Sequence, residues 1–130
     1  MAEITFREAI RQALREEMLH DERVFLMGEA LGAYGGTYAV TKGFLGEFGE
    51  KRVRDTPIAE NSIVGVAVGA AMGGLRPVAE IMTINFALLA MDEIVNHAAK
   101  LHYMFGGQIQ VPLVIRTAAG WGQLAATHSQ

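Results

Sequence analysis

Residues 53–81 read VRDTPIAENSIVGVAVGAAMGGLRPVAEI, and this stretch decides the fold. Residues 53–56 are a short strand candidate, which Pro57 ends. The small and apolar residues at 63–72 predict a helix, and residues 75–81 predict a second strand. A strand, a helix and a strand in this order are typical of a parallel sheet, because parallel neighbours need a crossover connection.

The same alternation of helix and strand continues on both sides of this stretch. Apolar residues over 6–18 fall at helical spacing, with Thr5 as a candidate N-cap and Glu8 completing a capping box. The apolar run at 24–27 predicts a strand that is buried on both faces. The remaining expected elements are helices at 38–48 and 86–104 and a strand at 111–116.

This order of elements predicts an α/β fold, with a mostly parallel sheet and helices on both faces. The length is that of one domain, spanning residues 1–130. Ligands of such sheets bind beyond the carboxyl ends of the strands. We therefore expect the functional site in the segments that follow the strands, at 28–37, 57–61, 82–86 and 117–130.

Composition narrows the classes of function. The chain has 11 Lys+Arg against 14 Asp+Glu and no basic block, so binding to nucleic acid is not expected. The absence of cysteine excludes disulfides and thiolate metal sites. The longest uncharged stretch, 61–75, is shorter than the ~20 residues of a membrane helix. Because the first residues also lack the pattern of a targeting peptide, we expect no membrane contact and no targeting peptide in this chain.

Glu60 is the first candidate for chemistry, because apolar residues lie on both sides of it in the sequence. A carboxyl in apolar surroundings is partly desolvated and can share a proton with a ligand nitrogen. The alternative is structural: an acid in the first turn of a helix stabilises the positive end of the helix dipole. The sequence leaves both interpretations open.

Other motifs are weaker. His128 follows a loop of small residues and is either a general acid or base or an ordinary loop histidine. Residues 120–125 match the dinucleotide fingerprint, but three residues separate them from the strand and no acidic residue follows. Gly65, Gly69 and Gly73 share one helix face, which packs either on this domain's sheet or on a partner.

Several ordered segments resemble one known family. RDTPIAE at 54–60, GVAVGAA at 65–71 and GLRP at 74–77 are similar to the β subunit of the thiamine-diphosphate-dependent 2-oxoacid dehydrogenase decarboxylase component, above all that of pyruvate dehydrogenase. The resemblance covers nearly the whole chain. It continues through MTINF at 82–86, AAK at 98–100, GGQ at 106–108, VPLV at 111–114 and HSQ at 128–130.

The resemblance implies a transketolase-like pyrimidine-binding domain. Glu60 then corresponds to a glutamate that hydrogen-bonds N1′ of the aminopyrimidine and promotes the tautomer that removes the thiazolium proton. Met82 and Phe86 correspond to residues beside the pyrimidine, and His128 to a histidine that faces the substrate and the lipoyl group. The carbonyl of Leu113 corresponds to one ligand of a structural potassium ion.

The implied activity is that of a pyruvate dehydrogenase, which passes the acetyl group to a lipoyl acyltransferase core and links glycolysis to acetyl-CoA. Implied partners are an α subunit, which supplies the Mg²⁺ and diphosphate site, and a second β subunit in a heterotetramer. The chain has no Gly-Asp-Gly segment followed by an asparagine pair, so we expect it to be inert alone. The implied location is the bacterial cytoplasm or an organellar matrix or stroma.

The departures from the family keep alternatives open. Family members are much longer, so we expect a domain truncated at its C-terminal end. Residues 117–122 differ from the common Arg-Gly-Pro-Asn-Gly loop, which leaves a branched-chain 2-oxoacid or acetoin dehydrogenase as alternatives. A non-catalytic assembly module is another alternative, and a dinucleotide-binding fragment is a third.

Overall fold

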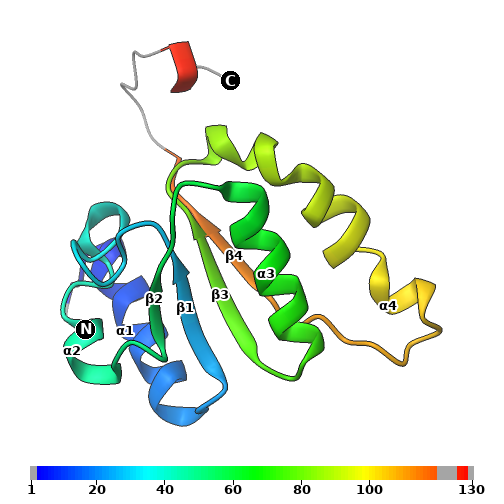
Figure 1. Cartoon of the computed structure of the whole chain (residues 1–130). Coiled ribbons are helices and arrows are strands. Elements are labelled where there is room, and N and C mark those ends of the chain that lie inside the picture. Colours follow the sequence, from blue (N-terminus) through cyan, green and yellow to red (C-terminus); the bar gives the residue numbers. More distant parts are fainter. Residues whose placement is uncertain (1–2, 120–125, 129–130) are drawn as a thin grey trace.

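The computed structural model describes residues 3–119 and 126–128, and it centres on a four-stranded parallel sheet (Figure 1). The strand order is β2-β1-β3-β4, and every pair is parallel. The predicted α/β fold is therefore confirmed. The strands are β1 (Val24–Gly28), β2 (Val53–Asp55), β3 (Arg76–Ile81) and β4 (Val114–Thr117).

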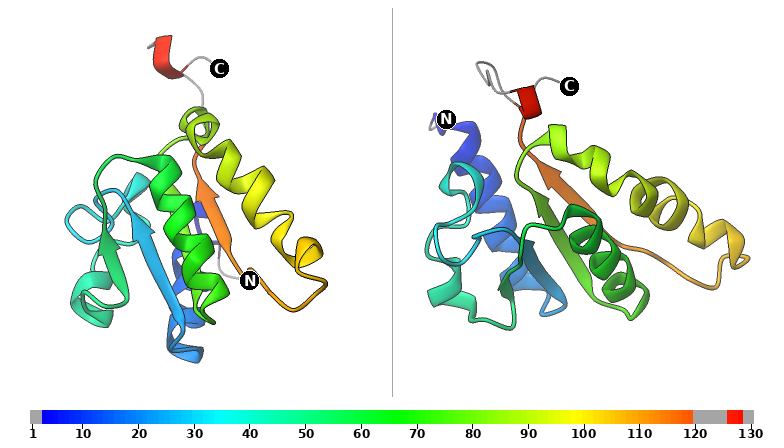
Figure 2. Two further views of the ribbon diagram at one scale, coloured as in Figure 1. Left: turned by 45° about the vertical axis from the view of Figure 1, so that its right-hand side comes forward. Right: turned by 45° about the horizontal axis from the view of Figure 1, so that its top comes forward.

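Helices cover both faces of the sheet (Figures 1 and 2). The chain moves from β1 to β2 in one direction and from β2 through β3 to β4 in the other. Right-handed crossovers in opposite directions place their connections on opposite faces. One face carries α1 (Phe6–His20) and α2 (Phe44–Phe48), and the other carries α3 (Glu60–Met72), η2 (Ile84–Ala90), η3 (Glu93–Ala98) and α4 (Leu101–Met104).

The start of α1 confirms the predicted capping box. The Thr5 hydroxyl accepts the backbone N–H of Glu8 at 3.2 Å, and Glu8 Oε2 accepts the backbone N–H of Thr5 at 2.9 Å. Two of the N–H groups that a helix start leaves unpaired are satisfied in this way. The helix therefore begins at Phe6, as the sequence predicts.

The core lies on both sides of β1, because successive side chains of a strand point to opposite faces. Leu26 packs with Met18 of α1 and Phe44 of α2, whereas Met27 packs with Ile63 of α3. All five residues of β1 are buried, which confirms the prediction of a strand covered on both faces. A third cluster joins α3, β3 and η2 and consists of Val64, Val68, Ile81, Ala87 and Ala90.

The helix predicted over 86–104 is wrong as a single α-helix. It is divided into the 3-10 helix η2, the π-helix η3 and the short α4. In a 3-10 helix, residues three apart lie above one another, so Ala87 and Ala90 both face the cluster on α3. The change of helix type follows from packing against α3, which periodicity alone does not contain.

The helix predicted over 38–48 is also wrong at its start. Only Phe44–Phe48 is α-helical, preceded by the 3-10 turn η1 (Thr37–Ala39). Gly43 lies in the left-handed region with a φ of 86°, which separates the two turns.

The glycine series on α3 has mixed surroundings. A Cβ on Gly65 would lie 3.2 Å from Glu93 Cδ, so this glycine allows η3 to pack closely within the domain. A Cβ on Gly69 would meet nothing within 4 Å, and Gly73 is the C-cap of α3. Packing on a partner thus stays a prediction for Gly69.

Among the residues that the structure describes, no helix combines the length and the apolar character needed to cross a membrane.

Candidate active site

Four of the expected segments meet at one edge of the sheet, because all strands run in the same direction. Glu29 follows β1, Glu60 follows β2 and Met82 follows β3. The short turn η4 (Ala126–His128) lies beyond the carboxyl end of β4, next to the start of η2 (Figure 1). The edge that brings these residues together is the one where parallel sheets bind their ligands.

Glu60 is the first residue of α3 and is only 5% exposed. The expected burial of this carboxyl is therefore confirmed. The structural interpretation also holds, since Glu60 lies in the first turn, where a helix dipole favours negative charge. The N-cap, Ala59, makes no side-chain hydrogen bond to the helix start. Glu60 is thus a buried carboxyl at the carboxyl end of the sheet.

Glu29 is a second buried carboxyl that the sequence analysis missed. It is 8% exposed, and its Oε1 has no hydrogen-bond partner within the described residues. Burial raises the pKa of Glu29, and the negative charge of Glu60 raises it further. A raised pKa means that Glu29 keeps its proton to a higher pH than a solvated carboxyl does. The sequence signal that could have identified Glu29 is its position as an acid directly after the apolar run of β1.

Phe86 and His128 lie in contact, although 42 positions separate them in the sequence. Their ring centroids are 5.0 Å apart, with an angle of 54° between the rings. Phe86 is on η2, and His128 Nδ1 lies 3.0 Å from the hydroxyl of Thr127. The structure thus brings two of the predicted site residues together beside the sheet edge. Their roles toward a ligand stay predictions.

The segment 82–86 is held from two sides. The backbone N–H of Ile84 donates to the carbonyl of Ala118, after β4, at 2.8 Å. The hydroxyl of Thr37, in the loop after β1, donates to the carbonyl of Met82 at 3.2 Å. The side chain of Met82 is 41% exposed, so it remains open to a ligand.

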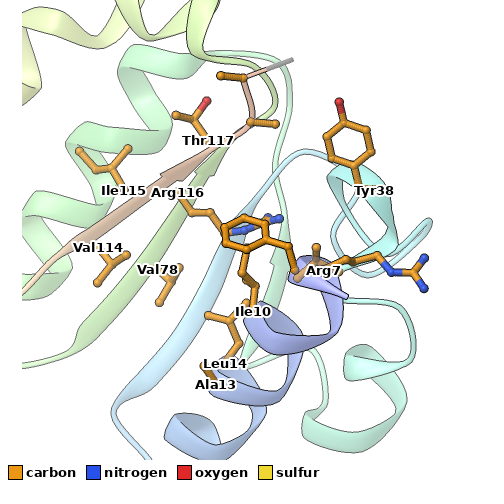
Figure 3. A pocket seen from close by; sticks show the side chains of 14 residues that line it. Arg7, Ile10, Ala13, Leu14, Tyr38, Val78, Val114, Ile115, Arg116 and Thr117 are labelled. Carbon is orange, nitrogen blue, oxygen red and sulfur yellow. The ribbon is translucent and has the colours of Figure 1, made fainter. Parts of the chain in front are cut away.

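A separate hollow of about 620 Å³ lies between α1 and the strands β3 and β4 (Figure 3). Apolar side chains such as Ile10, Leu14 and Val114 line it, with Arg116 beside them. Residues 117–119 of one expected segment line this hollow, but Glu60, Met82, Phe86, Leu113 and His128 do not. We place the chemistry at the sheet edge, because the buried carboxyls and the ring contact are there.

The remaining predictions about ligands are not tested by this geometry. Leu113 is half-buried between two core clusters, and the role of its carbonyl toward potassium stays a prediction. The dinucleotide-like motif at 120–125 lies outside the described residues. On η3 and just before it, Asp92, Glu93 and His97 offer potential ligand atoms within 4.8 Å of one another, and a Glu93–His97 ion pair of 2.9 Å already uses two of these residues.

Comparison with known families explains this arrangement. Residues 2–130 match the family model described as transketolase, pyrimidine binding domain. The chain belongs to this family. The transketolase-like fold expected from the sequence is thereby confirmed.

Relatives of this pyrimidine-binding domain are named pyruvate dehydrogenase E1 component subunit beta. The chain is 57% identical over 129 residues to that of Rickettsia bellii, covering 98% of this chain and 40% of the relative. It is 55% identical over 131 residues to that of Rhizobium meliloti, covering 100% of this chain and 28% of the relative. It is 50% identical over 129 residues to the mitochondrial protein of Bos taurus, covering 98% of this chain and 36% of the relative. The chain thus spans about two fifths or less of the length of these relatives.

Proposed function

We propose that this chain is the N-terminal, pyrimidine-binding part of a pyruvate dehydrogenase β subunit. The whole enzyme would decarboxylate pyruvate oxidatively and transfer the acetyl group to a lipoyl acyltransferase. The identity of 50–57% to proteins of that name supports the choice of pyruvate over branched-chain 2-oxo acids or acetoin. The observation that carries the proposal is the buried carboxyl of Glu60 at the ligand-binding edge of this domain.

The residues at the edge fit the pyrimidine of thiamine diphosphate. A ring nitrogen can share a proton with a buried carboxyl. Glu60 and Glu29 are both buried at this edge, and burial raises the pKa of Glu29. Oε1 of Glu29 is buried and unpaired within the described residues, as expected of a group that completes its hydrogen bonds through a ligand. When bound, thiamine diphosphate supplies the carbon nucleophile that attacks a 2-oxo acid.

The family resemblance assigns a role to each of these side chains, and their place at the edge supports it. Glu60 would share a proton with N1′ of the pyrimidine, and Glu29 is a second buried carboxyl at the same edge, with a raised pKa. Phe86 and Met82 provide an apolar surface for the ring. His128, held against Phe86, faces the reacting substrate and can donate or accept a proton there.

Partner chains are part of this proposal. The α subunit would bind Mg²⁺ and the diphosphate, since this sequence has no segment for either. A second β subunit and the lipoyl acyltransferase core would complete the assembly, and the carbonyl of Leu113 would be one ligand of a potassium ion. Exposed apolar side chains on the α3 side, including Leu88, Leu89 and Tyr103, support burial against other chains. The location would be the bacterial cytoplasm or an organelle.

The decisive experiment replaces Glu60 by glutamine in the full-length subunit assembled with its α partner. We expect decarboxylation of pyruvate to fall by at least about 100-fold, because general acid–base assistance contributes that much or more. Glu50→Gln, at an exposed position between α2 and β2, is the matched control and should leave the rate unchanged. A Glu60→Gln rate close to the wild-type rate would contradict the assignment of Glu60.

A second measurement separates the enzyme from a non-catalytic assembly module. The affinity for thiamine diphosphate is measured for the α subunit alone and for the assembled protein. An enzyme half-site must tighten binding, because Glu60 and its neighbours contact the ring. Equal affinities would favour the assembly module instead.

A further inference from the structure

Glu80 is a buried carboxylate that the proposed reaction does not use. It lies on β3, in register with Arg116 on β4, and is 4% exposed. Its Oε2 forms an ion pair with the Arg116 guanidinium, and Figure 3 shows Arg116 on the face of the sheet that carries α1. A charge buried this deeply is tolerated only when a counter-charge and hydrogen bonds satisfy it.

The second carboxylate oxygen of Glu80 binds a distant loop. Oε1 accepts the backbone N–H of Thr37 at 2.8 Å, across 43 positions of sequence. Gly36 makes this approach possible, because a Cβ there would lie 2.9 Å from the same oxygen and its φ is +67°. Glu80 therefore connects β3, β4 and the loop 30–42 at one point.

The loop 30–42 has a backbone that needs such support. Ala30, Tyr38 and Ala39 have φ values of 52°, 58° and 56°, in the left-handed region that residues with a side chain rarely adopt. Strained conformations of this kind persist only where surrounding contacts hold them. Asp55 accepts the N–H groups of Gly32 and Ala33 near the start of the loop, and Glu80 holds its middle.

The same loop also holds part of the candidate active site. The backbone of Thr37 is bound by Glu80, and its hydroxyl donates to the carbonyl of Met82 at 3.2 Å. Met82 begins the segment proposed to contact the pyrimidine. A contact on the α1 face of the sheet is thereby linked to the ligand-binding edge through one residue.

We propose that Glu80 is a positioning residue that fixes the loop 30–42 on the sheet, so that Thr37 holds the main chain of Met82 where the cofactor ring binds. Glu80 itself does not touch the ring. The part of this inference that concerns the cofactor rests on the proposed function, whereas the part that concerns the loop does not.

Two double variants separate the loop contact from the ion pair. Glu80→Gln/Arg116→Met removes both charges but keeps an oxygen that accepts the Thr37 N–H. Glu80→Met/Arg116→Met removes both charges and the acceptor as well. Neither leaves an unpaired buried charge, so both are expected to fold in the full-length subunit assembled with its α partner. The difference between them isolates the bond from Thr37 to Glu80.

Three readouts are compared: hydrogen exchange of the Thr37 amide, affinity for thiamine diphosphate, and kcat at saturating cofactor. For the first double variant we expect values within about threefold of wild type. For the second we expect amide exchange and cofactor dissociation constant to rise about tenfold, because a buried N–H loses its acceptor. The kcat of both should stay within about threefold, since the loop positions the site and takes no part in proton transfer.

Equal behaviour of the two double variants in exchange and affinity would overturn the proposal, as would a loss of kcat alone. Should the second double variant fail to fold, Thr37→Val decides: an unchanged cofactor affinity overturns the link to Met82, and a loss that Thr37→Ser restores supports it. If the wild-type assembly binds no thiamine diphosphate, the proposed function has failed, and amide exchange still decides the role of Glu80 in holding the loop.

Discussion

Buried carboxyls at the carboxyl half of this sheet have two opposite kinds of surroundings. Glu29 and Glu60 are both acids, and the pKa of Glu29 is raised by burial and by its neighbour. Glu80 instead meets the guanidinium of Arg116 and a backbone N–H. A carboxylate with a counter-charge and a hydrogen bond holds structure, whereas a buried carboxyl with an unpaired oxygen, such as that of Glu29, can bind a ligand or a proton. This contrast underlies the proposed division between Glu80, which positions the edge, and Glu60, which reacts.

The largest expected effect comes from breaking the ion pair of Glu80 and Arg116 on one side only. Arg116→Met leaves the Glu80 carboxylate buried without a cation, so we expect the free energy of unfolding to fall by about 3–5 kcal/mol. Urea unfolding of the assembled protein measures this change in the free energy of unfolding. The matched variant Glu80→Gln/Arg116→Met should recover most of the loss. A cost below about 1 kcal/mol for Arg116→Met would mean that water or another group already compensates Glu80.

A smaller effect is expected at Gly36. An alanine there would adopt a left-handed φ, and its Cβ would press on Glu80 Oε1 and on Leu31 Cδ2, both 2.9 Å away. We expect Gly36→Ala to lower the free energy of unfolding by roughly 1–3 kcal/mol. Gly46→Ala is the control, because a Cβ at Gly46 meets nothing within 4 Å. Equal stability of the two variants would show that the loop does not lie against Glu80.

The raised pKa of Glu29 should be visible as a pH dependence of stability. The pKa of Glu29 is raised above the ordinary value of 4.5, so the folded state binds more protons than the unfolded state above that pH. This contribution is present at low pH and is lost as pH rises from about 4.5 through the raised pKa. Unfolding measured against pH should show this decline in wild type. In Glu29→Gln the decline should be weaker, and an identical slope would contradict the burial of a titrating Glu29.

The smallest effect is expected for Thr37→Val, which removes one hydroxyl donor from the Met82 carbonyl. We expect a loss of about 1 kcal/mol, equivalent to roughly fivefold weaker binding of thiamine diphosphate. Thr41→Val is the matched control, since that hydroxyl binds the carbonyl of Leu31 inside the same loop. The control should change thermal stability but leave the affinity within about twofold. The same loss of affinity in both would indicate a general loosening of the loop.

Local signals predicted much of the fold from the sequence. The apolar run of β1, the capping box at Thr5 and the strand-helix-strand pattern of 53–81 all depend on neighbouring residues and are found in the structure. The single helix expected over 86–104 failed because packing against α3 changes the helix type, which no local pattern contains. The helix type in this segment therefore depends on tertiary contacts.

The candidate site also has a part that local sequence predicts and a part that depends on tertiary contacts. Glu60 was recognisable because its apolar neighbours are adjacent in sequence, and its burial is confirmed. Glu29 and Glu80 were missed, because their importance depends on groups brought near by the fold. Sequence showed where a carboxyl would be desolvated, and only the structure showed which carboxyls have a counter-charge.

Hydrogen–deuterium exchange at C2 of thiamine diphosphate bound to the full-length assembly tests the central claim most directly, since it reports on proton transfer apart from later steps. We expect Glu60→Gln to slow this exchange by at least about 100-fold, and Glu80→Gln/Arg116→Met to leave it within about threefold of wild type. Exchange at the wild-type rate in Glu60→Gln would contradict the proposed role of Glu60 in proton transfer. An equal slowing in the Glu80 double variant would contradict the proposal that Glu80 only positions the site.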